Sequence, residues 1–208
     1  DAGNYADSFA GGTGSSSNPY QIATAEQLAR LAFLINDSST NSTYKSLNYD
    51  VTNDIDLSLH YWKPVGTGSS TFSGNFNGNN HIFSGIFTDV ESGFQGLFGY
   101  LSNAQIHDLS IEDSEIVGEY YVGSVAGYAS DTTIYNCHNS SPIAGVNYGS
   151  SNDSYYGSGG GIVGYLYGSS SKVYNCSNSG TLDGKSSGGI VGYASSDAQI
   201  YDCFNEGE

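Results

Sequence analysis

The sequence is poor in basic residues. Of its 208 residues only 5 are lysine or arginine, against 21 aspartates and glutamates, which gives a formal net charge of −16. An acidic surface repels the phosphates of nucleic acids and the headgroups of anionic lipids, so we expect neither nucleic acid binding nor direct membrane binding. The acidic excess also suits cation binding, but a solvated and self-repelling surface accounts for it equally well.

Long hydrophobic runs are also missing, since no stretch approaches the ~20 apolar residues that a membrane-spanning helix needs. The chain contains no methionine, begins at Asp1 and shows no signal peptide, so we expect a mature fragment whose targeting segment has been removed. Charged residues make up only 12% of the chain, which contains 29 glycines and 18 tyrosines. This composition suits a secreted or cell-surface β protein better than a cytosolic enzyme.

The chain does contain an internal repeat. The hexapeptide GGIVGY occurs twice, and two degenerate copies lie upstream, so that the four copies start at residues 95, 123, 160 and 188. The spacings are therefore 28, 37 and 28 residues. The longer middle spacing predicts a loop insertion in an otherwise ordinary repeat, which we place at Asn147–Ser158.

Each copy is followed by a second shared segment, in which an aliphatic residue precedes a leucine or cysteine by three positions. A gap of three breaks the period of two of a straight strand, so the chain must bend if both residues point inward. The residue at the bend is always Asp or Asn, the non-glycine types that best tolerate the left-handed backbone conformation. These residues are Asp108, Asn136, Asn175 and Asp202.

Short strands joined by corners in repeating units predict a parallel β-solenoid, in which each repeat forms one coil. Stacked coils bury like residues in columns, and two columns can be recognised, namely Leu97, Val125, Ile162 and Ile190, and Leu109, Cys137, Cys176 and Cys203. An antiparallel β-sandwich of glycine-rich strands is the alternative, but the recurrence of whole units favours the solenoid. We expect an all-β parallel β-helix of about six coils.

The three cysteines share one of these repeat positions. We expect an inward-facing stack of free thiols, because cysteine is a good small core residue, although neighbouring coils also bring Cα atoms within disulfide range. The histidines fall at unmatched repeat positions, so we expect no zinc site and no cofactor. These histidines are His60, His81, His107 and His138.

The first third of the chain departs from the repeat. Residues 1–20 predict an irregular lead-in, and residues 21–208 predict one β-helix domain that continues in a longer natural protein. A capping-box pattern at Thr24 and Gln27 opens a helix at 24–36 that would cover the N-terminal open end of the solenoid. Its apolar stripe is Leu28, Leu31, Ala32 and Ile35. Further on, Gly74 and Gly78 bracket a predicted tight turn, which Asn79 and Asn80 continue.

Several segments together resemble bacterial surface proteins that carry the GLUG motif. These segments are NPYQIATAEQLARLAFLI, DIDLS, WKPVGT, FSGNFNGNNHIFSGI and GLFGYLSNAQIHDLSIED, with the GGIVGY copies resembling further GLUG-type repeats. The resemblance covers nearly the whole chain from about Asn18. It implies a right-handed parallel β-helix on a bacterial surface, either in an adhesin-like protein or in an accessory region of a large secreted enzyme such as some immunoglobulin A proteases. It supplies no catalytic residues.

Motifs of enzyme chemistry are absent: the sequence has no HExxH, no Gly-x-Ser-x-Gly elbow and no phosphate-binding loop. Glycoside hydrolysis needs two carboxylates, for which the candidates are Asp54 with Asp56, or Glu112 with Asp113 and Glu115. Aspartates beside Ile55 and Leu57 also fit an ordinary half-exposed strand. We therefore expect no catalytic site and keep a glycan-cleaving β-helix as the weaker alternative.

Tyrosine-rich segments predict a ligand-binding patch, because an aromatic ring supplies contact area at little entropic cost, although such loops also serve to shield a coil. The candidate residues are Tyr148, Asn152, Asp153, Tyr155 and Tyr156 in the insertion, with Tyr120 and Tyr121 nearby. The sequence predicts a non-catalytic, secreted or surface-anchored bacterial module, a rigid adhesin-like scaffold for host glycan or extracellular protein. The alternative is an accessory, substrate-positioning domain of a large secreted protease or glycan-active enzyme.

Overall fold

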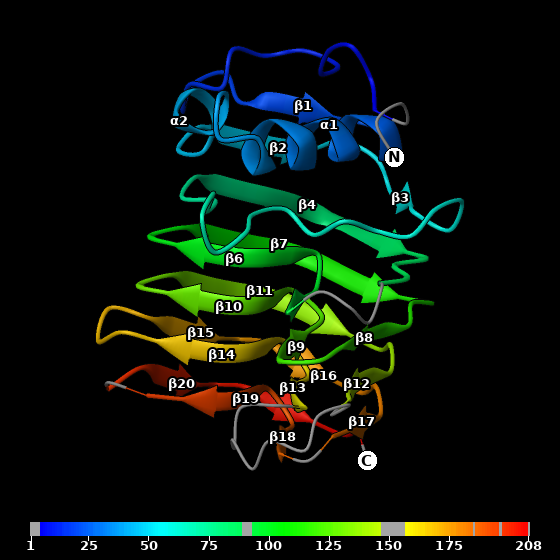
Figure 1. The fold of residues 1–208 in the computed structure, drawn as a ribbon, viewed down its shortest axis with the longest axis vertical. Helices are drawn as coiled ribbons and strands as arrows, with labels where there is room; N and C mark the ends of the chain where they lie inside the picture. Colours follow the sequence, from blue (N-terminus) through cyan, green and yellow to red (C-terminus); the bar gives the residue numbers. More distant parts are fainter. Residues whose placement is uncertain (1–4, 89–92, 147–156, 185, 196, 208) are drawn as a thin grey trace.

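Successive coils of the chain stack along one axis and form a parallel β-solenoid (Figure 1). The computed structural model describes residues 5–88, 93–146, 157–184, 186–195 and 197–207. In this part of the chain, every pairing between named strands is parallel and joins equivalent positions of neighbouring coils, for example Ile134 with Ile106 and with Val173. The predicted all-β fold of about six coils is confirmed, and the antiparallel sandwich is excluded.

The largest sheet runs along the whole solenoid in the order β1-β2-β4-β7-β11-β15-β20, with β3, β16 and β21 as short extensions. Its strands are β1 (Tyr20–Ile22), β2 (Asn48–Val51), β3 (Ile55–Asp56), β4 (Asn75–Ser84), β7 (Gln105–Glu112), β11 (Thr133–Asn139), β15 (Lys172–Tyr174), β16 (Ser177–Asn178), β20 (Gln199–Tyr201) and β21 (Phe204–Asn205).

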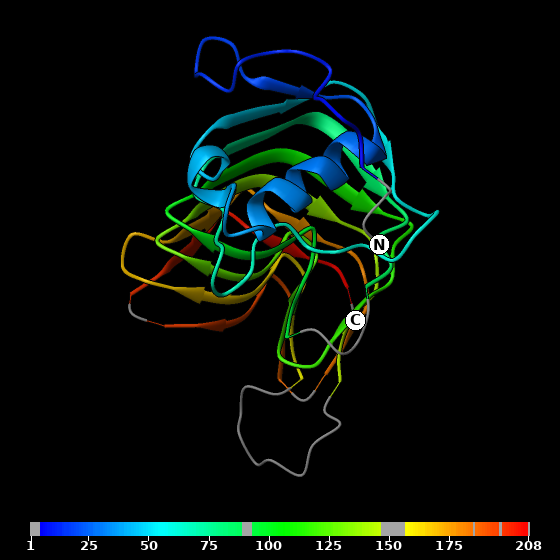
Figure 2. The same ribbon diagram turned by 45° about the horizontal axis from the view of Figure 1, so that its top comes forward.

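A second sheet faces the first across the core and contains β6 (Phe98–Ser102), β10 (Ala126–Ser130), β14 (Val163–Tyr167) and β19 (Val191–Ala194). Two sheets of very short strands project from the side of the solenoid as an arm (Figure 2). One consists of β8 (Ile116–Gly118), β12 (Ile143–Gly145) and β17 (Leu182–Asp183). The other consists of β5 (Phe94–Gln95), β9 (Tyr121–Gly123), β13 (Ser158–Gly160) and β18 (Ser186–Gly188).

The cysteine column predicted from the repeats lies in the core. Cys137 and Cys176 are buried, Cys203 is half-buried, and all three thiols are free. Each thiol points to a backbone carbonyl oxygen of the preceding coil, at 4.0 Å from Ile106 for Cys137 and at 3.7 Å from Val173 for Cys203. The same side-chain geometry therefore recurs from coil to coil, as the unbridged stack requires.

The Asx corners are confirmed as well. Asp108, Asn136, Asn175 and Asp202 all have left-handed backbones, with φ of 57°, 52°, 52° and 52°. A second set of corners, which the sequence reading missed, joins the second sheet to the first sheet within each coil. It consists of Asn103, Asp131, Gly168 and Asp197, with φ of 56°, 47°, 97° and 60°. Left-handed corners thus bend the chain at two places in each of these repeats.

The tight turn predicted between Gly74 and Gly78 is wrong, whereas its predicted continuation at Asn79 and Asn80 does bend the chain. The segment belongs to the continuous strand β4, whose register against β7 shifts between Asn77 and His81. Residues 78–80 lie opposite the single corner residue Asp108. The strand accommodates the two additional residues because Asn79 and Asn80 adopt left-handed conformations. Gly78 is required by close approach, because a Cβ there would overlap the carbonyl oxygen of Asp108 in the next coil.

The predicted helix is confirmed as α1 (Ala25–Asn36), and the short α2 (Asn41–Tyr44) follows it. The Thr24 hydroxyl accepts a hydrogen bond from the Gln27 N–H at 3.4 Å, and the Gln27 side chain accepts one from the Ala23 N–H at 2.8 Å. At its other end, the Asn36 side chain donates to the Pro64 carbonyl and accepts from the Gly66 N–H. Since Val65 pairs with Phe98 of β6, α1 continues the second sheet in place of a strand.

The lead-in, predicted to be irregular, protects the outer edge of β1. Gly11 and Gln21 form an antiparallel bridge, in which the Gln21 N–H donates to the Gly11 carbonyl and the Ala10 N–H donates to the Gln21 carbonyl, each at 2.9 Å. The helix therefore covers the end of the second sheet only, while the lead-in pairs with the exposed edge of the first. Arg30 on α1 holds it in place by donating to the Ala6 carbonyl at 3.0 Å.

Ile134 and Ile200 belong to the same core column, since both pair with Val173, and substitutions at these two positions test how much the stacking stabilises the fold. Ile134 is completely buried, whereas Ile200 in the last coil is 42% exposed. We expect Ile134→Ala to lower the free energy of unfolding by about 3 kcal/mol, and Ile200→Ala by about 1 kcal/mol, because only the first leaves a closed cavity. Urea unfolding followed by circular dichroism measures both, and equal losses would contradict the stacked core.

The corner at Asn175 provides a second test. Replacing Asn175 with alanine places a Cβ-bearing residue that lacks the Asx side chain at φ 52°, and we expect a loss of about 1 kcal/mol in the free energy of unfolding. Asn175→Gly is the matched control, since glycine adopts this conformation without strain. Thermal unfolding of the two variants measures the difference, and an alanine variant as stable as the glycine variant would show that the corner is not strained.

Candidate ligand-binding site

Glycines in the repeated hexapeptide allow the arm to pack directly on the second sheet. A Cβ at Gly127 would lie 2.7 Å from the backbone nitrogen of Gln95, and one at Gly164 would lie 2.5 Å from that of Val122. No side chain fits between the two backbones at these positions, so glycine is required. The tyrosine that follows each of these glycines is thereby placed beside the junction between the sheet and the arm.

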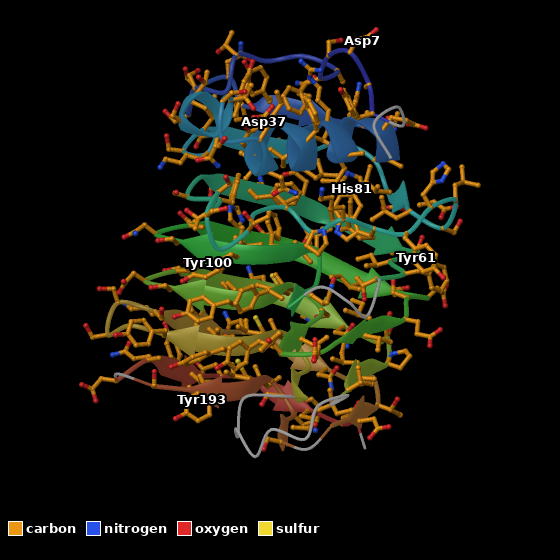
Figure 3. The ribbon with its side chains drawn as sticks, in the orientation of Figure 1. Asp7, Asp37, Tyr61, His81, Tyr100 and Tyr193 are labelled. Carbon is orange, nitrogen blue, oxygen red and sulfur yellow. The ribbon has the colours of Figure 1, made fainter. Side chains whose placement is uncertain are left out.

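These tyrosines form a row along the outer side of the second sheet, one from each strand and all in the same register. The ring centroids of Tyr100 and Tyr128 are 4.3 Å apart, those of Tyr128 and Tyr165 are 5.0 Å apart, and those of Tyr165 and Tyr193 are 4.9 Å apart. Figure 3 shows Tyr100 and Tyr193 at the two ends of the row. We call these four residues the tyrosine face.

Aromatic residues of the arm pack against the tyrosine face. The Tyr121 ring lies 4.8 Å from that of Tyr165 and stacks on Phe94 at 6.0 Å with an interplanar angle of 12°. Tyr121 is 8% exposed, whereas Tyr193 is 40% exposed and the rest of the row is half-buried. The result is a continuous aromatic surface whose rings are fixed by one another and whose outer side is open to solvent.

The surroundings of Tyr128 favour its neutral phenol. Burial raises the pKa of Tyr128, and its hydrogen bond with Tyr100 raises it further. The Tyr165 hydroxyl lies 2.9 Å from the Ser195 hydroxyl. The face therefore offers apolar rings together with hydroxyl groups that both donate and accept hydrogen bonds.

The candidate residues from the insertion, Tyr148, Asn152, Asp153, Tyr155 and Tyr156, lie outside the described residues. The ends of the insertion are anchored on the arm, where the Val146 and Gly157 N–H groups donate to the Gly118 and Glu119 carbonyls, each at 2.8 Å. Tyr120 is half-buried with its ring 6.5 Å from Phe94, so both Tyr120 and Tyr121 belong to the surroundings of the tyrosine face. The sequence analysis did not predict the tyrosine face, although each hexapeptide copy ends in one of its tyrosines.

A second aromatic row lies on the first sheet and differs in geometry. His107, Tyr135, Tyr174 and Tyr201 stack with centroid separations of 4.7, 5.1 and 5.0 Å and interplanar angles of 3°, 3° and 4°. Rings that are stacked in this way cover each other's faces and present only their edges to a ligand. In the tyrosine face only Tyr100 and Tyr128 are stacked, whereas Tyr128, Tyr165 and Tyr193 meet edge to face with interplanar angles of 72° and 88°, so we consider this row the better binding surface.

The carboxylates considered for catalysis have local structural partners. Asp54 accepts hydrogen bonds from the Ile82 N–H and from the His81 ring, each at 3.0 Å, and the Ile82 hydrogen bond is the main cause of its lowered pKa. Asp56 accepts from Ser58, which lowers its pKa too. A general acid needs a raised pKa, so neither carboxyl is suited to donate a proton. Of the other candidates, Asp113 occupies a left-handed corner with φ of 46°.

Within the described ranges, no three histidine, cysteine or acidic side chains gather in a way that would hold a metal ion. The same part of the chain contains no helix of the length and apolarity that crossing a membrane requires.

No family model matches the chain, so the GLUG resemblance is not confirmed in this way. Over 130 residues, the chain is 32% identical to a protein of Evansella cellulosilytica named "putative Gly-rich membrane protein". The match covers 57% of this chain and 14% of that protein, so the chain spans only about a seventh of the length of this relative.

A solved structure also resembles the chain. It is a "putative immunoglobulin A1 protease" from Bacteroides ovatus, which superposes with a TM-score of 0.67 over 96% of this chain and 69% of that one. The sequence identity is 17%, so this likeness shows the fold alone. Both comparisons are consistent with a β-helix protein.

The raised pKa of Tyr128 predicts a loss of stability in alkali. The folded state favours the neutral phenol, so the stabilisation is complete below the unfolded pKa of about 10 and is lost as the pH rises above it. We expect Tyr128→Phe to weaken the decline in the urea midpoint between about pH 9 and 11.5. The control is Tyr61→Phe, at a side chain that is 79% exposed. Parallel declines in wild type and Tyr128→Phe would contradict the assignment.

Proposed function

We propose that this chain is a non-catalytic module of a secreted or cell-surface bacterial protein, and that it binds glycan through the tyrosine face. The observation that carries the proposal is the in-register row of four tyrosines, with neighbouring rings 4.3 to 5.0 Å apart along the solenoid. A sugar ring has apolar C–H faces and a rim of hydroxyls, and a tyrosine surface offers both an apolar ring and a hydrogen-bonding group to match them.

Preorganisation supports this function. The row lies on strands that pair from coil to coil, and each ring packs on its neighbours, so little side-chain entropy remains to be lost when a ligand binds. The repeat also spaces the rings regularly along the axis. An extended glycan chain lying along this axis would meet one tyrosine after another, which favours polymeric over monomeric sugars.

The comparisons are compatible with a surface or secreted module. The relative from Evansella cellulosilytica is named as a membrane protein, and the solved structure from Bacteroides ovatus is titled as an immunoglobulin A1 protease. Together with the segments quoted above, they support our proposal that the chain is a GLUG-type β-helix exposed on a bacterial cell. We propose host glycans as its partners, with neither nucleic acid nor membrane insertion involved.

An accessory role in a large secreted enzyme is the second candidate. The likeness to the titled protease extends over 96% of the chain, and the curated relative is far longer than this chain. In this role the tyrosine face would hold a glycosylated substrate for a catalytic domain elsewhere in the protein. A hydrolase domain in the same gene would favour this candidate over adhesion.

Binding to a glycan array tests the proposal. We expect Tyr193→Ala to weaken binding of the retained glycans about tenfold, a loss of about 1.4 kcal/mol, because it removes one exposed ring from the row. Tyr201→Ala is the matched control, because Tyr201 is exposed to nearly the same extent (42% against 40%) but lies on the opposite sheet. An array that retains nothing, or equal binding by Tyr193→Ala and wild type, would contradict the proposal.

A further inference from the structure

A concave site lies away from the tyrosine face, between α1 and the segment that follows β3. It has a volume of about 860 Å³, within the ~300–1,000 Å³ that ligand sites usually occupy. Its lining comes from the outer side of α1, from residues 56–63 and from Tyr5, and includes none of the four tyrosines of that face. We call this site the helix-side cavity.

The helix-side cavity is apolar and partly open. Phe33 on α1 is 40% exposed and stacks on Tyr5, with centroids 4.3 Å apart and an interplanar angle of 14°. On the other side, Leu59 and Tyr61 are each 79% exposed, although both are large apolar side chains. Such a group of exposed apolar residues around a hollow is typical of a binding surface.

The segment that carries Leu59 and Tyr61 is fixed to the core. The next residue, Trp62, is 7% exposed and donates its indole N–H to the Leu97 carbonyl at 3.1 Å. The Trp62 N–H also donates to the Phe87 carbonyl at 2.7 Å. These contacts of Trp62 fix the backbone directly after Tyr61.

Carboxylates dominate the charge of the helix-side cavity. Glu26, Asp37 and Asp56 line it, against one lysine, Lys63. Hydrogen bonds from Thr24, Ser39 and Ser58 lower the pKa of the three carboxyls, so they stay ionised in mildly acidic conditions. On the far side of Leu59 and Tyr61, a smaller hollow of about 470 Å³ adds Glu115.

We propose that the helix-side cavity binds a basic peptide segment of a partner protein. Its apolar side chains would lie against Phe33 and Tyr61, and its lysine or arginine groups would meet Asp37 and Asp56. The combination of aromatic rings and carboxylates suits cations on apolar stems, which gain from ion pairing and from cation–π contacts. The volume holds several side chains, which favours a peptide over a single small amine.

The only tryptophan of the chain, Trp62, lines this cavity, so its fluorescence reports on this site selectively. The probe is a blocked hexapeptide of alternating leucine and lysine. Its controls are the corresponding leucine–glutamate and serine–lysine hexapeptides and n-butylammonium. We expect saturable changes in Trp62 emission with the first peptide, and binding at least tenfold weaker with each control, because the cavity requires apolar contact and positive charge on one chain.

Variants at exposed positions locate the binding. Tyr61→Ser and the double variant Asp37→Asn with Asp56→Asn are each expected to weaken the leucine–lysine peptide about tenfold. The matched charge control is Asp131→Asn with Asp197→Asn, which removes two carboxylates from left-handed corners that asparagine tolerates. We expect less than a twofold effect from this control, and circular dichroism confirms that each variant is folded.

Four outcomes would overturn the proposal. Equal binding of the leucine–glutamate peptide would remove the role of charge, and equal binding of the serine–lysine peptide would remove the role of the apolar surface. Equal binding of n-butylammonium would indicate a site for small amines. Equal losses from the Asp131/Asp197 and Asp37/Asp56 variants would show that the peptide responds only to the net charge of the protein.

Discussion

The register between neighbouring coils is the constraint on which the rest of the structure depends. It is expressed in a ladder of amides, buried at Asn139 and Asn178, in which Asn139 donates to the Asn178 side chain at 2.7 Å and Asn178 donates to that of the exposed Asn205 at 2.8 Å. An amide carries both donor and acceptor groups, so it can pair with a copy of itself above and below. A shift of register by one residue would place these groups among apolar side chains without partners, at a cost of several kcal/mol.

The same register turns a feature of local packing into a surface. Glycine at positions such as Gly127 and Gly164 is required because the backbone of the arm touches the sheet there, and the next residue in each copy faces the junction. Any residue type repeated at that position becomes a row. Since the residue is tyrosine, the solenoid has a rigid aromatic face, and no additional loop has to be ordered to form it. The hexapeptide thus encodes both the attachment of the arm and the candidate site.

Repetition also explains which features the sequence alone could predict. The core columns, the cysteine stack and the corners at Asp108 and Asn136 recur, so each copy supported the interpretation of the others. The pairing of Gly11 with Gln21 occurs once and depends on a contact between segments that share no pattern, so it had no sequence signal. The tyrosine that ends each hexapeptide recurs as well, but the predicted binding residues lay in the insertion and at Tyr120 and Tyr121. A repeated residue serves packing and recognition at once, and periodicity alone does not separate the two.

The N-terminal end shows how a solenoid acquires a hollow. Strands in a sheet lie ~4.8 Å apart, whereas a helix with its side chains is ~10 Å across, so one helix matches the height of two strands. Figure 1 shows α1 opposite both β1 and β2, in agreement with this ratio. The connection that follows β3 pairs with the next coil at Leu57 and again from Trp62 and Val65 onward, and between these contacts it makes a detour. Leu59 and Tyr61 project from this detour, and the helix-side cavity is the space that helix and strand packing leave between them.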